Sequence, residues 1–282
     1  MKGSPMNILL AYFSQTGNTE KLCEVFADTL RAGGHTVRVL SLKDASPADF
    51  TNCDVLGFGA PCFESQAPAP VKNFLRSLPP LSGKPAFVFA TSGGAPGRVL
   101  YDLSTGLEEK GAAVIGGYSS RGMVHHPAPC LKGRMPDRPD RDDLAQARSF
   151  ALAVDRRLKA GSPGPMPEGA KDVLKPGWGF YDLISLIAEP FLLRILLPKP
   201  MPDRSLCNQC GVCAQECPVQ CISPDHYPTP GRECIRCYRC VNICPQKAPN
   251  VSWRFGNLVI FMLYNPLFIR LFGDLKPGER IY

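Results

Sequence analysis

The sequence predicts an α/β fold with a doubly wound parallel sheet of five strands, followed by a second, small α+β domain rich in cysteine. In the first half of the chain, short apolar runs alternate with longer amphipathic stretches, the pattern of a parallel sheet covered by helices. Nine of the 13 cysteines lie between Cys207 and Cys244. The 282 residues suffice for one well-buried core and a smaller second unit.

Five apolar runs are the predicted strands. The third, fourth and fifth runs are almost continuously apolar, as expected for strands that helices cover on both faces. The predicted strands are Asn7–Phe13, Thr36–Leu42, Asp54–Ala60, Lys84–Thr91 and Ala112–Ser119.

Four amphipathic stretches between and after these runs predict helices. Gly33 and Gly111 follow two of these stretches, at positions where glycine typically ends a helix. The fourth stretch places apolar residues such as Leu144, Ala151 and Leu158 on one face. The predicted helices are Thr19–Ala32, Pro70–Leu78, Gly97–Lys110 and Arg141–Lys159.

The segment Ser14–Thr19, after the first predicted strand, has the composition of a phosphate-binding loop. In parallel sheets, ligands bind at the carboxyl ends of the strands, near the topological switch point. Hydroxyl and amide side chains and backbone N–H groups at the start of a helix hold a phosphate without a lysine. The alternative is an ordinary helix N-cap, where Ser, Thr and Asn are also favoured. Neither G-x-x-x-x-G-K nor G-x-G-x-x-G follows a strand, so no triphosphatase or dinucleotide fold is indicated.

This loop is similar to the Ser/Thr-x-Thr-Gly-Asn-Thr loop of the flavodoxin family, and the resemblance covers roughly residues 7–159. It implies that the chain binds FMN and that the phosphate is held by Ser14, Gln15, Thr16, Gly17, Asn18 and Thr19. It also implies two loops that flank the isoalloxazine ring, formed by Ala60, Pro61, Cys62 and Phe63, and by Thr91, Ser92, Gly93 and Gly94. Phe63 is the one aromatic candidate for stacking, so one ring face is expected to be open. Cys62 either tunes the flavin or is a small buried thiol.

A long loop, Arg121–Pro139, follows the fifth predicted strand and leaves from the same edge of the sheet as the flavin loops. It contains His125, His126 and Cys130. Because an unperturbed histidine has a pKa of about 6.5, His125 and His126 are candidate catalytic proton donors to a substrate on the open flavin face. The alternative is a solvent-exposed loop in which the two histidines have no catalytic role.

The cysteine-rich region contains one spacing twice. The first run is Cys207-x2-Cys210-x2-Cys213-x3-Cys217-Pro218, and the second is Cys234-x2-Cys237-x2-Cys240-x3-Cys244-Pro245. This resembles the bacterial two-cluster ferredoxins, in which the fourth cysteine of each run ligates the other cluster. The resemblance implies a first [4Fe-4S] cluster on Cys207, Cys210, Cys213 and Cys244, and a second on Cys234, Cys237, Cys240 and Cys217. Zinc is the less favoured alternative, since zinc sites use one C-x2-C pair per half. Cys221 is predicted to be a small core residue.

Charge differs between the two runs. Arg232, Arg236 and Arg239 surround the second run, whereas the first carries Gln209, Gln215 and Glu216. Positive charge favours the reduced form of a cluster, so the second cluster is predicted to be the easier to reduce, unless hydrogen bonds and exposure override the side chains. The formal net charge of +7 falls close to zero once eight thiolates with their irons and a flavin phosphate are counted. No nucleic-acid partner is therefore predicted.

Two apolar stretches, Trp178–Leu197 and Leu258–Phe272, lie outside the regular patterns. Charges and prolines interrupt both, so neither predicts a clean membrane span. They either clamp the two domains together, which is favoured because a small cluster domain has little core, or form a homodimer interface, or touch a membrane surface.

The predicted division of the chain is a flavin domain at 1–160, a Pro/Gly-rich linker at 161–202, a cluster domain at 203–250 and an apolar tail at 251–282. The clustered cysteines and the lack of a secretory signal predict a cytoplasmic protein.

Together these parts resemble flavodoxin–ferredoxin fusions, a family of anaerobic iron–sulfur flavoproteins. The resemblance implies an oxidoreductase that moves electrons from a low-potential donor, such as a ferredoxin or a redox enzyme, through two [4Fe-4S] clusters to FMN and on to a small-molecule acceptor. A non-catalytic relay between redox proteins is the alternative. A scaffold that has lost FMN is disfavoured by the intact first loop.

Overall fold

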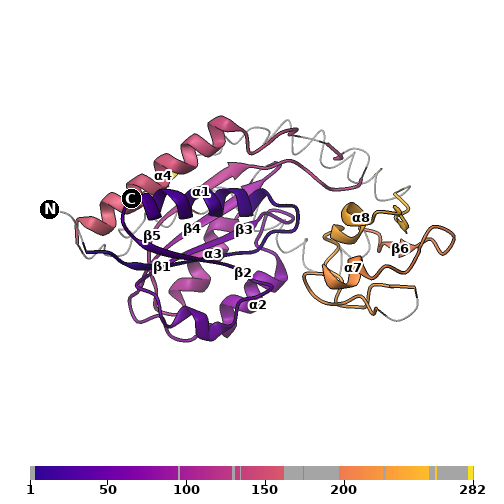
Figure 1. Cartoon of the computed structure of the whole chain (residues 1–282), viewed down its shortest axis with the longest axis horizontal. Coiled ribbons are helices and arrows are strands. Elements are labelled where there is room, and N and C mark those ends of the chain that lie inside the picture. Colours follow the sequence, from indigo (N-terminus) through magenta and orange to yellow (C-terminus); the bar gives the residue numbers. More distant parts are fainter. Residues whose placement is uncertain are drawn as a thin grey trace. The chain divides into compact units, whose positions relative to one another are not determined.

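The computed structural model describes residues 4–94, 96–128, 131–133, 135–161, 174, 197–224, 227–253, 258 and 279–281. The chain forms two compact units (Figure 1). The first unit comprises Met1–Met123, Asp137–Ser185 and Leu275–Tyr282, and the second comprises Val124–Pro136 and Leu186–Asp274.

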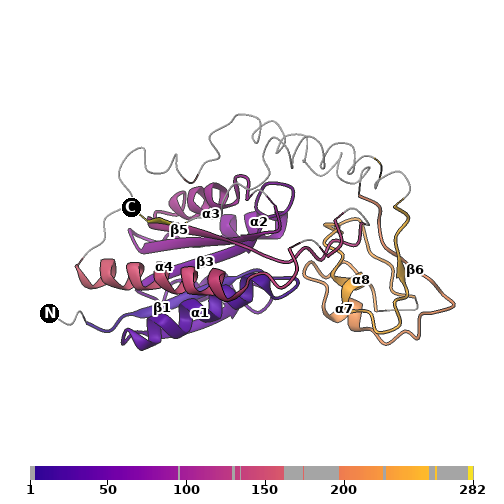
Figure 2. The same ribbon diagram turned by 90° about the horizontal axis from the view of Figure 1, so that it is seen from above.

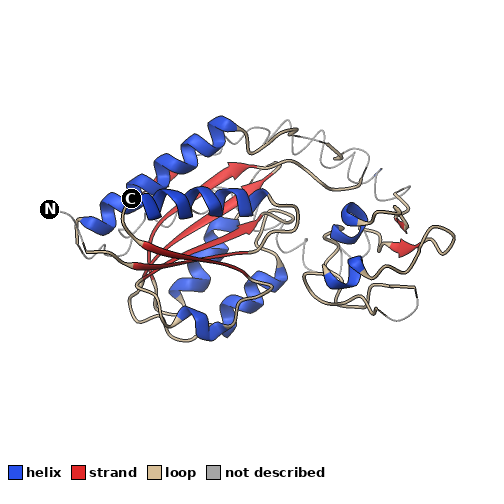
Figure 3. Ribbon diagram, in the orientation of Figure 1, coloured by secondary structure: helices blue, strands red, loops and turns tan. Residues whose placement is uncertain are grey.

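The first unit is built on a sheet flanked by helices (Figure 3), and the order of its strands is β2-β1-β3-β4-β5-β8. The five parallel strands confirm the predicted fold class, and β8 (Glu279–Ile281), which was not predicted, pairs antiparallel with β5. The parallel strands are β1 (Asn7–Tyr12), β2 (Thr36–Ser41), β3 (Val55–Pro61), β4 (Pro85–Ser92) and β5 (Ala113–Arg121).

Helices cover both faces of this sheet. Helices α1 (Asn18–Ala32) and α4 (Arg141–Lys159) pack together on one face, and α2 (Ala69–Ser77) and α3 (Val99–Glu108) pack together on the other (Figure 2). A short 3-10 helix, Pro47–Phe50, precedes β3. Each predicted strand and helix is present, with ends within two residues of the predicted ones.

An aromatic cluster forms the core between the sheet and the helices α1 and α4. Phe26 of α1 lies at its centre, with ring centroids 4.9 Å from Phe89, 5.7 Å from Phe150 and 6.0 Å from Tyr118. The strands carry glycine where these rings need room, since a Cβ at Gly59 would lie 2.0 Å from the Phe89 ring. This packing fixes the ends of the strands from which the candidate site is built.

The second unit has little regular structure. It contains the short helices α7 (Val212–Gln215) and α8 (Arg239–Ile243), and the two-residue strands β6 (Met201–Pro202) and β7 (Pro249–Asn250), which pair antiparallel. Tyr238 is its largest fully buried side chain, and the Tyr238 hydroxyl donates to the Pro198 carbonyl over 2.9 Å. The turns between these elements carry the cysteines.

The contacts divide the chain differently from the predicted boundaries in the long loop, in the linker and in the tail. Residues Val124–Pro136 of the long loop belong to the second unit, and Leu174, in the predicted linker, is buried in the first unit over Gly117. The two apolar stretches lie outside the described residues apart from Leu197 and Leu258, so their clamping, dimer and membrane interpretations stay predictions. No helix in the described part of the chain is long and apolar enough to cross a membrane.

Candidate cofactor sites

The loop between β1 and α1 presents donors at the start of a helix. Gly17 is the N-cap residue of α1 and adopts a left-handed conformation with φ of 86°. A Cβ atom added at Gly17 would have no atom within 4 Å apart from those of the adjacent residues, so the space beside this residue is open. The Gly17 N–H donates to the Ser14 hydroxyl over 3.1 Å. Within the described residues no side chain caps the first turn of α1, so its N–H groups remain available for an anion. This arrangement fits a phosphate group.

Two threonines of the predicted FMN site face each other. The Thr19 and Thr91 hydroxyl oxygens lie 2.9 Å apart, and both residues are buried. This bond ties the first loop to the third, so the two hydroxyls shape the site. Asn18 connects the first loop to the start of the long loop after β5, because its side-chain amide donates to the Met123 carbonyl over 2.9 Å.

The second loop is a tight turn held by backbone bonds. Phe63 and Gln66 exchange two N–H to carbonyl bonds of 2.9 Å, and the two residues between them have positive φ, 44° at Glu64 and 65° at Ser65. The Cys62 N–H donates to the Thr91 carbonyl over 2.8 Å, which joins this loop to the third. Consecutive left-handed residues other than glycine are strained, so other contacts must hold this turn in place.

Asp102 of α3 supplies these contacts, and the sequence analysis did not identify it. Its carboxylate accepts from the Ala67 N–H over 3.0 Å and from Arg98 Nε over 2.7 Å, and lies 3.5 Å from Lys72 Nζ. The Arg98 backbone N–H also donates to the Ser65 carbonyl over 2.7 Å. No local sequence signal marks this role, because Ala67 lies 35 residues away in the sequence.

Two side chains of the flavin loops have defined surroundings. The Phe63 ring packs edge-on against Phe13 at a centroid distance of 6.4 Å. Burial raises the pKa of the Cys62 thiol to about 12, so Cys62 stays protonated at neutral pH, and its role beside the flavin stays a prediction.

The third loop is held by a buried arginine that the sequence analysis also missed. Arg121, at the end of β5, is buried and donates to the Gly94 carbonyl. The Ser92 hydroxyl donates to the same carbonyl over 3.1 Å and accepts from the Gly94 N–H over 3.2 Å. The structure therefore gives the third loop a fixed shape from Ser92 to Gly94.

The candidate proton donors His125 and His126 lie in the second unit. The His126 ring packs against Tyr238 at 4.9 Å and Trp253 at 5.1 Å. Burial lowers the pKa of His126 to about 4, so the expectation of an ordinary histidine pKa is wrong for this residue. The His125 carbonyl accepts from the Asn242 side chain over 3.0 Å. These contacts favour a packing role for this segment, and catalysis by either histidine stays a prediction. Cys130 lies outside the described residues.

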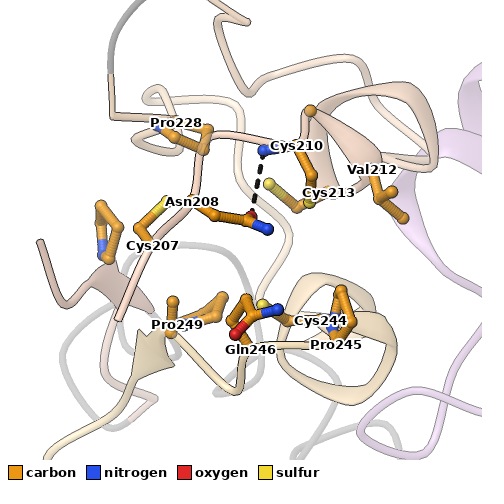
Figure 4. A pocket seen from close by; sticks show the side chains of 13 residues that line it. Cys207, Asn208, Cys210, Val212, Cys213, Pro228, Cys244, Pro245, Gln246 and Pro249 are labelled. Carbon is orange, nitrogen blue, oxygen red and sulfur yellow. Dashed lines mark hydrogen bonds between the residues drawn. The ribbon is translucent and has the colours of Figure 1, made fainter. Parts of the chain in front are cut away.

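Each of the two cysteine quartets lines one cavity. The first cavity is lined by Cys207, Cys210, Cys213 and Cys244 (Figure 4). The lining of the second includes Cys217, Cys234, Cys237 and Cys240. These are the groupings that the ferredoxin resemblance implied, with the fourth cysteine of each run in the cavity of the other. Among the described residues, no three or more His, Cys, Asp or Glu side chains converge on a position for a single ion.

The residues around these cavities suit an iron–sulfur cluster. Four thiols line the first space and five line the second, and cysteine thiolate is the usual ligand of such clusters. The Asn208 side chain accepts from the Cys210 N–H over 3.3 Å and fixes the turn between two ligands (Figure 4). In the second cavity, the Cys221 N–H donates to the Cys217 sulfur over 3.4 Å.

The three arginines of the second run differ in their surroundings. Arg232 is exposed, whereas Arg236 and Arg239 are half-buried. Arg236 Nε donates to the Leu197 carbonyl over 3.1 Å, and Arg239 forms a 2.5 Å ion pair with Glu216. Glu216 belongs to the first run in sequence, yet its ion pair places it beside the second cavity, which Arg239 lines.

Comparison with known proteins identifies the first unit. A flavodoxin of Megasphaera elsdenii is 30% identical over 110 residues, which make up 38% of this chain and 80% of that protein. The chain belongs to the flavodoxin family. The family model for the flavodoxin domain matches residues 9–114. A flavodoxin of Clostridium beijerinckii is 25% identical over 109 residues, 38% of this chain and 79% of that protein. A solved flavodoxin structure from the domain Archaea covers 55% of this chain and 99% of its own, with a TM-score of 0.44 and 19% identity.

Two further matches cover the cysteine runs outside the flavodoxin domain. Family models described as 4Fe-4S binding domains match residues 200–223 and 233–250. The chain is thus a flavodoxin–ferredoxin fusion, and its cofactors are FMN and two [4Fe-4S] clusters. It is an electron-transfer flavoprotein.

Proposed function

We propose that this flavoprotein is a reductase that moves electrons from a low-potential donor through its two [4Fe-4S] clusters to FMN and on to a small-molecule acceptor. The observation that carries the proposal is that one chain combines a flavodoxin phosphate loop with two cavities, each lined by one of the two predicted cysteine quartets. When bound, FMN exchanges one or two electrons and each cluster exchanges one, so the set can accept single electrons and deliver pairs.

The described residues prepare the FMN site before the cofactor binds. The free N–H groups at the start of α1, together with Ser14, Thr16 and Asn18, bind and orient the phosphate. The Thr19–Thr91 bond and the Asp102 contacts hold the loops that flank the ring. Phe63 is the only aromatic side chain in these two loops, so one face of the ring is left for an acceptor.

A relay between redox proteins is the second candidate function. It is favoured if the cluster domain presents several arginines to an acidic partner protein. Two of the three candidates are half-buried and bonded within the second unit, Arg236 to a carbonyl and Arg239 to Glu216. Of these three arginines only Arg232 is exposed, so this group is a weak basic surface. This supports the reductase over the relay.

The test is an anaerobic spectroelectrochemical titration of the reconstituted protein that follows the flavin absorbance and the cluster EPR signals together. The reductase requires about eight irons and one FMN per chain. It also requires that the flavin take up both electrons in one step, above the cluster potentials. Two well-separated one-electron steps of the flavin would contradict the reductase and support the relay.

Two cysteine variants test whether the cysteine runs bind the iron. Cys207→Ala removes a thiol from the first cavity and is expected to lower the iron content by about half. Cys53→Ala is the matched control, because Cys53 lies in the flavodoxin domain, where it donates to the Phe50 carbonyl. Its iron content should equal that of the unmodified protein. Equal iron loss in both variants would contradict the assignment of the clusters to the cysteine runs.

A further inference from the structure

The second cavity has a fifth cysteine on its wall. Cys221 lines this cavity together with the four expected ligands, and its sulfur lies 3.6 Å from the sulfur of Cys217. The sequence analysis predicted a small core residue here, but Cys221 is only half-buried and faces the cluster space. Its thiol is therefore next to one particular corner of the site, the corner that Cys217 occupies.

A tight turn brings the two cysteines together. The Gln220 N–H donates to the Cys217 carbonyl over 3.0 Å, and Gln220 has a positive φ of 48°. The chain therefore reverses within Cys217–Gln220 and returns Cys221 to the start of the turn. The Gly231 N–H donates to the Cys221 carbonyl over 2.5 Å, which fixes the backbone of Cys221 from the other side. The fold therefore fixes the backbone of Cys221 beside Cys217, so that the thiol stays near this corner of the cavity.

The second run contains the same turn without the extra thiol. The Lys247 N–H donates to the Cys244 carbonyl over 3.1 Å, and Lys247 has a positive φ of 52°. The residue that corresponds to Cys221 is Ala248, which lines the first cavity. Since alanine fills this position in one half of the domain, the packing there does not require a cysteine. The sulfur of Cys221 is thus a feature of the second cavity alone.

We propose that Cys221 is a reserve ligand of the second cluster, placed to take over the iron position of Cys217. A change of one χ1 rotamer moves a cysteine sulfur by about 3 Å, close to the 3.6 Å that separates the two sulfurs. In the exchange, the iron–sulfur bond to Cys217 is replaced by one to Cys221. Cys221 binds the iron as a thiolate, the departing Cys217 thiolate takes up the proton that the Cys221 thiol gives up, and no electron is transferred. This inference rests on the cluster sites of the proposed function.

The test compares the fourth cysteine of the two runs. In the full-length protein, reconstituted without oxygen, Cys217→Ala is expected to keep its full iron content and both cluster EPR signals, because Cys221 replaces the missing ligand. Cys244→Ala is the matched variant in the first cavity, where Ala248 offers no thiol, and it should lose about half of the iron. The double variant C217A/C221A should lose about half as well. Loss of half of the iron in Cys217→Ala alone would overturn the proposal.

A transplant gives the proposal a second, independent test. The double variant C244A/A248C moves the reserve thiol into the first cavity and should regain the iron that Cys244→Ala lost. The single variant Cys221→Ala, with all four primary ligands intact, should keep the full iron content. Failure of the transplant to regain iron would overturn the proposal even if Cys217→Ala did not accumulate as a folded protein.

The cofactor content of the unmodified protein distinguishes a failure of the proposed function from a failure of the reserve-ligand proposal. If it binds FMN but fewer than two clusters, the proposed function fails. If it binds both clusters and Cys217→Ala loses one of them, the proposed function stands and the reserve-ligand proposal is wrong. FMN content, measured in every variant, reports that the flavodoxin domain is folded.

Discussion

The two units hold their cofactors by different physical means. Of the eleven largest fully buried side chains among the described residues, only Tyr238 belongs to the second unit, and the rest form the core of the flavodoxin domain. The buried hydrophobic residues of the second unit, within the part of it that is described, are Ala128, Leu197, Cys217, Ile222, Tyr238 and Ala248. The flavodoxin domain thus has a core that is independent of its site, whereas the core of the cluster domain is largely the lining of its two cavities.

This difference shows how each site depends on its ligand. In the flavodoxin domain the loops begin at the ends of buried strands, so packing positions them before FMN binds. In the cluster domain the cysteines lie on short turns, and metal binding supplies the stabilisation that a small core cannot.

Removal of the clusters is expected to have the largest effect. Iron chelation under mildly oxidising conditions should abolish the structure of the second unit, because the thiols lose the bonds that hold the turns together. The flavodoxin domain should remain folded and bind FMN. Limited proteolysis, with FMN fluorescence on the same sample, measures both domains. A cluster domain that resists protease after losing its iron would contradict the claim that metal binding stabilises this domain.

A substitution that leaves a cavity in the aromatic core tests whether the flavodoxin domain is stabilised by its own core. Phe26→Ala should lower the free energy of unfolding of the flavodoxin domain by about 3–5 kcal/mol, since Phe26 lies at the centre of the ring cluster. Urea denaturation followed by near-UV circular dichroism measures this loss, and the iron content should not change. Leu152→Ala on α4 is the control, because Leu152 is 45% exposed and should change stability by less than about 0.5 kcal/mol. A parallel loss of iron in Phe26→Ala would show that the two units are not independent.

The sequence predicted these two units unequally well. In the flavodoxin domain, hydrophobic periodicity located the five parallel strands and the four α-helices but not the three-residue strand β8, because burial of apolar faces decides the longer elements. In the cluster domain, cysteine spacing identified the ligands and their cavities, although α7, α8, β6 and β7 were not predicted. Elements of two to five residues carry no periodicity to detect.

The side chains that support the sites were the least predictable. Asp102 and Arg121 act through contacts with residues far away in sequence, Ala67 and Gly94, and nothing local marks them. His126 was predicted from its ordinary pKa, but its neighbours Tyr238 and Trp253 come from another part of the chain and change that pKa. Such effects require the tertiary contacts to be known.

Asp102→Ala tests whether the flavodoxin domain positions its loops before FMN binds. Without this carboxylate, Ala67 and Arg98 lose an anchor and the strained turn at Glu64 and Ser65 is freed. We expect FMN to bind about tenfold more weakly, as measured by titration of fluorescence quenching.

The control is another buried aspartate, Asp155, which pairs with His35 and Lys159 at the amino end of β2, the opposite edge of the sheet from the FMN loops. Asp155→Ala should lower stability and leave FMN affinity unchanged. Equal weakening of FMN binding in both variants would mean that general destabilisation, and not the turn, is responsible.

Neutralising Glu216 is expected to have the smallest effect, and it tests the charge difference between the clusters. The arginines of the second run predicted that the second cluster is the easier to reduce, but the Glu216 carboxylate offsets Arg239 beside that cavity. Glu216→Gln should therefore raise the potential of the second cluster by a few tens of millivolts and leave the first unchanged, as followed by EPR-monitored redox titration. The change is small because the side chains of the pair are 25% and 37% exposed, so water screens their charges. Glu24→Gln, an exposed position on α1, is the control and should move neither potential. A larger shift at the first cluster than at the second would mean that Glu216 acts on the cavity of its own run, as its place in the sequence suggests.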